Sequence, residues 1–352
     1  MSQNAAAKFQ LPERIESEQQ LDDLLTTPTL GLLKTVTGLS SDLVVLGVGG
    51  KMGPTLARLA RRALDQAGST RQVIGVDRFP EPEAREKLEA NGVKTITADL
   101  LDRQALSALP DAQEVIFMAG RKFGSTGQEE LTWAMNVCLP ALVAERYRNA
   151  RIVAISTGNV YPFMPAAGPG PTEDHPTGPV GEYAQTCLGR ERMFQYGSSK
   201  NGTRVTLIRL NYAIDLRYGV LVDVASKVLH GEPIDLAMGY ANVIWQGDAN
   251  SAILRALDHA ASPPFILNLA GPEIVSIRKA AEEFGKLFGK KPVFRGQEAE
   301  NALLSNSTRY VQLMGGPTVP VAQLIRWVAH WLTAGGRLLG KPTHYEARDG
   351  KF

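Results

Sequence analysis

The stretch DLVVLGVGGKMG, residues 42–53, decides the fold of this chain of 352 residues. Its first half is a short apolar run with β-branched residues, which predicts a buried strand over 42–47. The glycines that follow have the spacing G-x-x-G-x-x-G with a fourth glycine inside it: Gly47, Gly49, Gly50 and Gly53. Helical spacing then begins at residue 51, so the glycines form a strand-to-helix turn. Such a turn exposes backbone N–H groups at the start of the helix, where they can hold a pyrophosphate.

Apolar runs and helical periodicity alternate through the rest of the chain. Each run is apolar throughout, which is typical of strands buried on both faces of a parallel sheet. The expected strands are 72–77, 93–97, 114–118, 151–156, 204–209 and 265–269. The expected helices are 51–67, 83–91, 128–149, 217–230, 249–260, 276–288 and 319–333. The pattern predicts an α/β protein with a Rossmann-type doubly wound parallel sheet and a smaller C-terminal substrate lobe.

We expect the chain to divide into four parts. They are an N-terminal extension (1–40), a dinucleotide-binding domain (41–215 plus 243–272), a smaller lobe (216–242 plus 273–335) and a C-terminal tail (336–352).

The second strand ends in an acid, Asp77, which favours the glycine turn as a cofactor site over a purely structural turn. A carboxylate at this place accepts both hydroxyls of an adenosine ribose and repels a 2′-phosphate, so NAD is favoured over NADP. Lys51 and Arg78 oppose this preference, because either cation could pair with a 2′-phosphate. Asp99 follows the third strand and has two interpretations. It either accepts from the adenine amino group or forms the N-cap of a helix over 100–108.

Composition excludes several function classes. The 38 basic and 36 acidic residues give a net charge of +2 without a basic stripe, which argues against a nucleic-acid partner. No apolar run is long enough to cross a membrane, and the N-terminus lacks the apolar core of a signal peptide. Cys138 and Cys187 suit reduced thiols in a cytoplasmic protein. The five histidines and two cysteines show no metal-ligand spacing, so no metal is expected.

Several motifs in order resemble the extended short-chain dehydrogenase/reductase family, the NAD-dependent sugar epimerase/dehydratase group. The resemblance covers about residues 42–335 and rests on the glycine turn, VIGVD ending at Asp77, and the motifs ADL (98–100), FMAG (117–120), ISTGNVYP (155–162), TEDHPTGPVGEY (172–183), LIRLN (207–211), GEPIDL (231–236), VIWQGDANSAILRAL (243–257) and FILNLAGPE (265–273). It implies NAD as cofactor, with Met52, Leu100, Ala119 and Gly120 beside the residues named above. It also implies a homodimer, paired through the helices at 128–149 and 181–200.

The family's catalytic groups are a Ser or Thr after the fifth strand and a Tyr and Lys four residues apart on the following helix. The Tyr exchanges a proton with the substrate while the nicotinamide exchanges a hydride. The Lys holds the nicotinamide ribose and lowers the Tyr pKa. The resemblance places Thr157 at the hydroxyl position and Tyr183 at the Tyr position, but the Lys position holds Cys187. A Tyr-x-x-x-Lys does exist at Tyr196 and Lys200. It is rejected because it precedes the sixth strand closely, where the active-site helix is expected to have ended.

Other departures narrow the expected substrate. Gly158 and Asn159 stand where sugar-nucleotide dehydratases have Asp and Glu, and Ala241 stands where many relatives have a phosphate-binding Arg. A substrate smaller than a nucleotide sugar is therefore expected, such as a sugar, a sugar acid or a similar polyol. The substrate residues are expected to be Lys122, Asn159 and Asn211, and Arg121 or Lys122 could replace the missing cation. A loop rich in Pro and Gly (162–182), which carries Glu173 and His175, is expected to cover the site.

Two functions remain open. The chain is either an NAD(P)-dependent oxidoreductase or epimerase of a small sugar-like substrate, or an NAD(P)-binding sensor or structural protein without redox turnover. The cysteine at position 187 favours the second, whereas Tyr183 and Thr157 favour the first.

Overall fold

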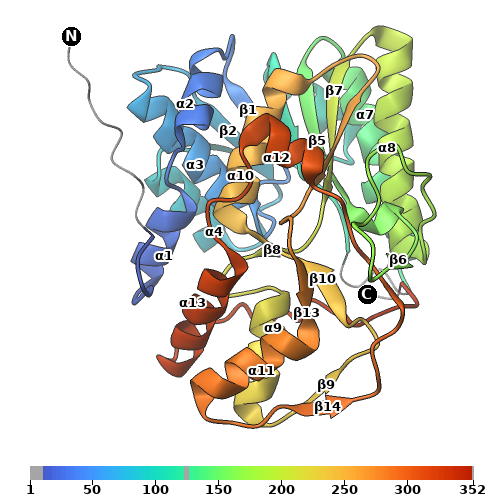
Figure 1. Cartoon of the computed structure of the whole chain (residues 1–352). Coiled ribbons are helices and arrows are strands. Elements are labelled where there is room, and N and C mark those ends of the chain that lie inside the picture. Colours follow the sequence, from blue (N-terminus) through green and yellow to red (C-terminus); the bar gives the residue numbers. More distant parts are fainter. Residues whose placement is uncertain (1–10, 123–126, 351–352) are drawn as a thin grey trace.

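The centre of the molecule is a seven-stranded parallel sheet. The structure is a computed structural model that describes residues 11–122 and 127–350 (Figure 1). The strand order is β12-β7-β5-β4-β1-β2-β3. In that order the strands are Phe265–Leu269, Arg204–Leu210, Arg151–Thr157, Glu114–Phe117, Leu43–Leu46, Val73–Asp77 and Lys94–Thr97. This is the doubly wound topology that the sequence predicts, and it reverses direction between β1 and β4, where such sheets open a crevice for ligands.

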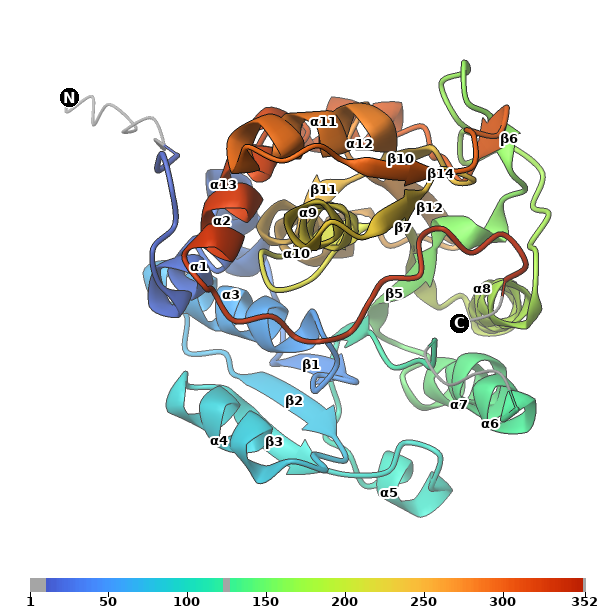
Figure 2. The same ribbon diagram turned by 90° about the horizontal axis from the view of Figure 1, so that it is seen from below.

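Both faces of the sheet are covered by helices (Figure 2). Val45 and Ile116 belong to the core under α2 (Leu30–Thr37), α3 (Gly53–Gln66) and α10 (Gln246–Arg255). Val44 and Phe117 belong to the core of the other face, together with residues of α7 (Leu139–Arg146) and α8 (Glu182–Asn201). Neighbouring residues of one strand thus enter different cores, which explains why the strands read as apolar throughout. The sheet edge beyond β1 carries α4 (Pro82–Ala90) and α5 (Arg103–Ser107).

The long helix expected over 128–149 is interrupted. The chain there forms α6 (Glu129–Trp133), a π-helical turn η1 (Ala134–Cys138) and α7. Asn136 of the π turn is buried, and its amide contacts the backbone N–H and C=O of Arg121 at 2.8 and 2.9 Å. The widened turn therefore accompanies a tertiary contact that helical periodicity does not reveal. Smaller differences occur at α9 (Val220–His230), which begins after Gly219 (φ +135°), and at 256–259, which is a 3₁₀ turn.

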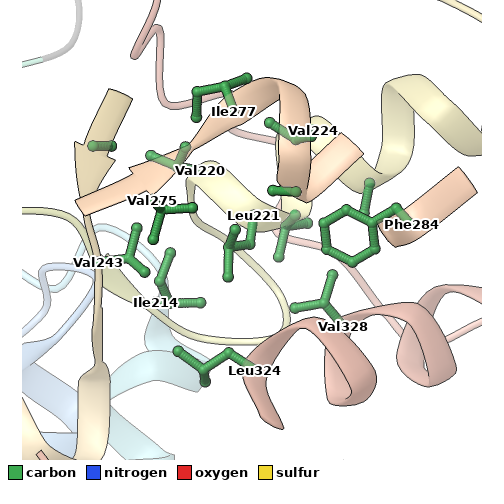
Figure 3. Packing of buried hydrophobic residues seen from close by; sticks show 14 of the residues in the cluster. Ile214, Val220, Leu221, Val224, Val243, Val275, Ile277, Phe284, Leu324 and Val328 are labelled. Carbon is green, nitrogen blue, oxygen red and sulfur yellow. The ribbon is translucent and has the colours of Figure 1, made fainter. Parts of the chain in front are cut away.

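The C-terminal lobe packs α9, α11 (Ile277–Phe288) and α13 (Val321–Thr333) around one apolar cluster (Figure 3). Val220, Leu221, Phe284 and Val328 meet at its centre. Leu21 and Leu25 of α1 (Glu18–Leu25) join the same cluster from the N-terminal segment.

Short strand pairs complete the lobe and its junction with the sheet. They are β9 (Pro233–Asp235) with β14 (Val293–Arg295), β10 (Tyr240–Asn242) with β13 (Ile274–Ser276), β8 (Ala213–Ile214) with β11 (Ile244–Trp245), and β6 (Met164–Pro165) with β15 (Asn301–Ala302). The helix α12 (Thr308–Met314) lies against β12. The exact division of the chain into four parts stays a prediction.

After α13 the chain runs back over the molecule as an extended tail (Figure 2). Leu339 donates to the carbonyl of Arg217 at 3.0 Å, and Tyr345 is 2 % exposed. The Arg348 guanidinium lies 4.3 Å from the Phe163 ring centre, beyond the cofactor crevice. The described part of this tail, 336–350, is therefore packed against the body of the protein. Within the described residues, none of the helices combines the length and apolarity needed to span a membrane.

Candidate active site

The glycine turn between β1 and α3 is built for close backbone contact. Gly47 has φ +83°, and a Cβ there would lie 2.5 Å from the backbone nitrogen of Ala119. A Cβ on Gly53 would collide with the carbonyl of Val48. The helix begins at Gly53 without a side-chain cap, and its N-cap is Met52. Its first amides are therefore not satisfied by a capping side chain, which suits an anion at this end of the helix.

Asp77 at the end of β2 faces this turn. Its carboxylate accepts from the backbone N–H of Gly49 at 2.9 Å and from that of Arg78 at 2.7 Å. Arg78 itself is exposed, and the Lys51 ammonium lies away from Asp77, 2.7 Å from the Tyr218 ring centre. Lys51 thus lines the cavity together with Tyr218, whereas Asp77 does not line it.

Residue Asp99 is not the N-cap of the following helix. That helix, α5, is capped by Asp102, which accepts from Gln104 and Ala105, whereas Asp99 accepts from Leu101 at 3.0 Å. The N-cap interpretation is therefore wrong, and a cofactor contact stays a prediction. Leu100 is buried in the core of the sheet.

A cavity of about 270 Å³ opens at the carboxyl ends of β4, β5 and β7 beside the glycine turn. The strand ends form the floor of this cavity, and residues of the C-terminal lobe form the opposite wall. Of the residues expected to form the site, it collects Gly47, Gly50, Lys51, Met52, Gly53, Gly120, Lys122, Thr157, Asn159, Tyr183 and Asn211. Asp77, Arg78, Asp99, Leu100, Ala119 and Cys187 do not line it. Asp77 and Arg78 lie outside the cavity, where the Asp77 carboxylate contacts Gly49 of the glycine turn.

Tyr183 stands at the start of α8, and its hydroxyl is hydrogen-bonded to Thr157 and to Cys187. Burial raises the pKa of Tyr183 well above its ordinary value, the nearby thiol of Cys187 raises it further, and the charge of Arg190 lowers it. Cys187 is fully buried behind the tyrosine, next to Val160, and burial also raises the pKa of its thiol. Tyr183 is therefore a neutral phenol at neutral pH.

These elements match a known family model, described as the NAD dependent epimerase/dehydratase family, over residues 43–270. The chain belongs to this family. The family predicted from the sequence is therefore confirmed, as are the enzyme class and the cofactor, NAD, that define it.

Solved structures with the same fold include two nucleotide-sugar epimerases and one dehydratase. UDP-glucose 4-epimerase from Thermotoga maritima has 16 % identity and a TM-score of 0.68, covering 84 % of this chain and 99 % of its own. UDP-glucuronic acid 4-epimerase from Bacillus cereus, solved with NAD, has 17 % identity and a TM-score of 0.67, covering 83 % and 98 %. dTDP-glucose 4,6-dehydratase from Bacillus anthracis, solved with NAD, has 15 % identity and a TM-score of 0.68, covering 84 % and 97 %. No curated protein sequence matches the chain significantly.

Two lysines of this family member reach into the cavity. The Lys122 ammonium lies 6.0 Å from the Tyr183 ring centre and donates to the Thr343 carbonyl at 3.4 Å. Burial lowers the pKa of Lys122 to about 8. Burial, and then the positive charge of Lys122, lower the pKa of Lys51 to about 7, although the Lys51 residue as a whole is exposed. Arg121 also lines the cavity and donates to Gln128 at 2.6 Å.

Two asparagines complete the floor. Asn159 and Thr157 are mutually hydrogen-bonded, since the Asn159 backbone N–H donates to the threonine hydroxyl at 3.2 Å and the hydroxyl donates to the Asn159 side chain at 3.1 Å. Asn211 at the end of β7 donates to Ser305 at 3.3 Å. A Cβ on Gly158 would lie 2.8 Å from the Asn211 amide oxygen, so glycine allows these strand ends to approach.

The loop 162–182 does not supply the cover that the sequence predicts. Glu173 is buried elsewhere and accepts from the backbone N–H of Asn268 at 2.9 Å. His175 lies 6.3 Å from the Tyr161 ring and pairs with the Pro176 carbonyl. Neither lines the cavity; Thr343 of the C-terminal tail does. The Thr343 backbone N–H and hydroxyl both donate to Asp223 of α9, at 2.8 and 2.5 Å.

The second Tyr-Lys pair, Tyr196 and Lys200, lies on α8 itself, because that helix continues to Asn201. The expectation that the active-site helix ends before Tyr196 is thus wrong. Tyr196 is 61 % exposed, and neither residue lines the cavity. The pair is the polar C-terminal part of the helix, which ends at Gly202 in the left-handed conformation.

Arg190 is a residue of the cavity that sequence reasoning missed. It lines the cavity, is 6 % exposed, and donates to the Ile155 carbonyl at 2.6 Å and to Asn136 at 2.7 Å. A signal was present, because Arg190 follows Cys187 by three residues and Tyr183 by seven, and therefore shares their helix face. Tyr218 and Thr343, from the lobe and the tail, were missed because no local pattern connects them to the turn.

Proposed function

We propose that this chain is an NAD-dependent oxidoreductase or epimerase that acts on a hydroxyl or carbonyl group of a small sugar-like substrate. The observation that carries the proposal is the shared cavity, in which Tyr183 and Thr157 face the same space as the glycine turn. An acid/base pair beside a dinucleotide turn suits proton transfer coupled to hydride transfer.

The residues present fit NAD. The crowded glycines at 47 and 53 leave no room for side chains where a pyrophosphate would approach, and α3 offers its uncapped first turn. The Asp77 carboxylate would accept the adenosine ribose hydroxyls, while Lys51 is turned away from that position. When bound, NAD would accept or return a hydride at the substrate carbon.

The chain's own residues would manage the proton. In the reducing direction, the neutral phenol of Tyr183 gives its proton to the substrate carbonyl oxygen, and Thr157 hydrogen-bonds that oxygen. In the oxidising direction Tyr183 must first lose its proton, which its raised pKa makes difficult near neutral pH. The protonated resting form of Tyr183 is therefore the form that reduction uses, whereas oxidation first needs its ionisation.

The cavity favours a small substrate. Its volume of about 270 Å³ lies just below the usual range for ligand pockets, ~300–1,000 Å³. Ala241, where many relatives have a phosphate-binding arginine, is fully buried on β10. A sugar or sugar acid therefore fits better than a nucleotide sugar, with Lys122, Asn159 and Asn211 as its polar contacts. The homodimer and the cytoplasmic location stay predictions.

A second function has its own support. The cysteine at position 187 and the raised pKa of Tyr183 together favour an NAD-binding protein without redox turnover, used as a sensor or a subunit.

The two functions are separated by a turnover assay with NAD and NADH against a panel of sugars, sugar acids and their keto forms, followed by nicotinamide absorbance. We expect turnover with at least one substrate and a loss of about 100-fold or more in Tyr183→Phe, the usual scale of a lost general acid. Calorimetry should show NAD binding more tightly than NADP. NAD binding without turnover above the Tyr183→Phe background would instead support the second function.

A further inference from the structure

Tyr183 lacks the lysine that its family places one turn along the helix, yet its surroundings contain another fixed cation. We propose that Arg190 supplies the positive charge beside Tyr183, as a positioning residue that acts through the tyrosine. This inference deepens the proposed function, because it concerns the acid/base residue named there.

Arg190 is held where three strand and helix ends meet. Its two terminal nitrogens donate to the Ile155 carbonyl on β5 and to Asn136 in the π turn, at 2.6 and 2.7 Å. The same guanidinium occupies the space of a side chain on Gly120, at the end of β4, where any Cβ would collide with it. The glycine and the π turn thus both accommodate this one side chain.

The alternatives among the described cations are weaker. The groups that bear on Tyr183 are Cys187 and Arg190 on its own helix, and Lys122 after β4, at 6.0 Å from the ring centre. Lys122 has a pKa of about 8, so it becomes neutral before the Tyr183 phenol can ionise. An arginine stays charged throughout this range. Arg190 is therefore the cation that persists at the pH where Tyr183 would act as a base.

Arg190 is also retained at a cost. Its Nε is buried and has no hydrogen-bond partner among the described residues. A buried N–H without a partner is unfavourable, and apolar side chains of α8 such as Phe194 show that this helix face could be packed without a charge. Burial of this charged side chain therefore has an energetic cost that its two hydrogen bonds to Ile155 and Asn136 partly offset.

The test measures the acidity of residue 183 directly, in the chain without cofactor or substrate. 3,5-Difluorotyrosine is placed at position 183, because its phenol is acidic enough to titrate while the protein stays folded, and its phenolate absorbance is followed against pH. We expect Arg190→Met to raise this pKa by about one unit or more, since Arg190 and Tyr183 line the same cavity and a nearby opposite charge shifts a pKa by ~1–3 units. Arg190→Lys should retain most of the effect.

Two further variants sharpen the result. Arg192→Met removes an equal charge from an exposed site two residues along the same helix, where Arg192 donates to Gln195 at 2.7 Å, and should leave the pKa unchanged. Adding Cys187→Lys to Arg190→Met should lower the pKa again, because it restores a cation beside the phenol. Arg190→Gln, which keeps a donor for the Ile155 carbonyl, replaces the methionine variant if circular dichroism shows that variant unfolded.

An unchanged pKa in a folded Arg190→Met or Arg190→Gln chain would overturn the inference, as would an equal shift in Arg192→Met. Because the titration needs no turnover, failure of the proposed function would leave the expected pKa shifts in place, and the two failures are distinguishable.

Discussion

At the scale of residues, Cys187 adds to the effect of burial on the protonation state of Tyr183, the candidate acid/base residue. Its thiol is fully buried, hydrogen-bonded to Tyr183 and uncharged, where a relative's lysine would be a cation. Burial raises the pKa of both groups, and at Cys187 the charges of Arg190 and Lys122 and the hydrogen bond with Tyr183 oppose this effect. The phenolate of Tyr183 therefore forms only at alkaline pH, and the site is biased towards proton donation.

We expect substrate oxidation to accelerate as pH rises, because the phenolate is the form that accepts a proton and its pKa is raised. Cys187→Lys should move this rise to lower pH by ~1–3 units, since an adjacent cation lowers the tyrosine pKa. The measurement is kcat/KM for oxidation against pH.

Cys138→Lys is the matched control for this prediction, because Cys138 is exposed and its replacement should leave the profile unchanged. A Cys187→Lys profile that coincides with the parent's would show that Tyr183 is not the group whose ionisation limits oxidation.

At the scale of elements, α8 is attached to the sheet by a buried ion pair. Glu191 and Arg209 of β7 are 2.8 Å apart and almost fully buried, and Glu191 also accepts from Ser156 at 2.7 Å. Arg209 in turn donates to the Tyr161 hydroxyl at 2.7 Å. These contacts fix the helix that carries Tyr183 against the strand ends that carry Thr157.

Glu191→Gln should destabilise the protein by about 3–5 kcal/mol, because Arg209 would remain as a buried charge without its partner. Urea unfolding gives the change in free energy. Glu283→Gln, which removes an exposed pair with Lys286 at 2.6 Å, should cost less than ~1 kcal/mol. Comparable losses in the two variants would mean that the buried pair does not secure α8.

The elements also show how far the sequence could predict the site. The strands and the glycine turn were predictable, because hydrophobic periodicity, β-branched side chains and the glycines that a tight turn requires can all be recognised in residues that are neighbours in the sequence. The break at Asn136 was not, since its amide is satisfied by the backbone of Arg121, fifteen residues earlier. Arg190 was missed for a similar reason: its importance depends on Gly120, which only the folded sheet brings to its guanidinium.

At the scale of the whole molecule, the C-terminal tail joins the two lobes over the cavity. Thr343 connects Asp223 of the lobe with Lys122 of the sheet, and Glu346 pairs with Lys227 at 3.2 Å. The matched family region ends at residue 270, far before this segment. The loop 162–182, which the sequence predicts as the cover of the site, does not line the cavity. The C-terminal tail, which contains no family motif, contributes Thr343 to it instead.

Removal of residues 341–352 should raise the substrate KM by about tenfold or more while NAD affinity changes less. The lost contacts include two hydrogen bonds to the Asp223 carboxylate, each worth ~1.5–3 kcal/mol. Steady-state kinetics and calorimetry measure the two effects. Thr343→Val keeps the tail but removes the hydroxyl bond to Asp223, so it should give a smaller increase in KM. A truncated chain with an unchanged KM would show that the tail has no part in the site.

The tail also determines the stage of translation at which the complete cavity can form. A ribosome that has released residues up to about 335 presents a chain that contains every strand of the sheet and every helix of the lobe. The segment that places Thr343 between the two lobes leaves the exit tunnel after all of these elements. Nascent chains stalled before this segment would therefore fold without Thr343 in the wall of the cavity.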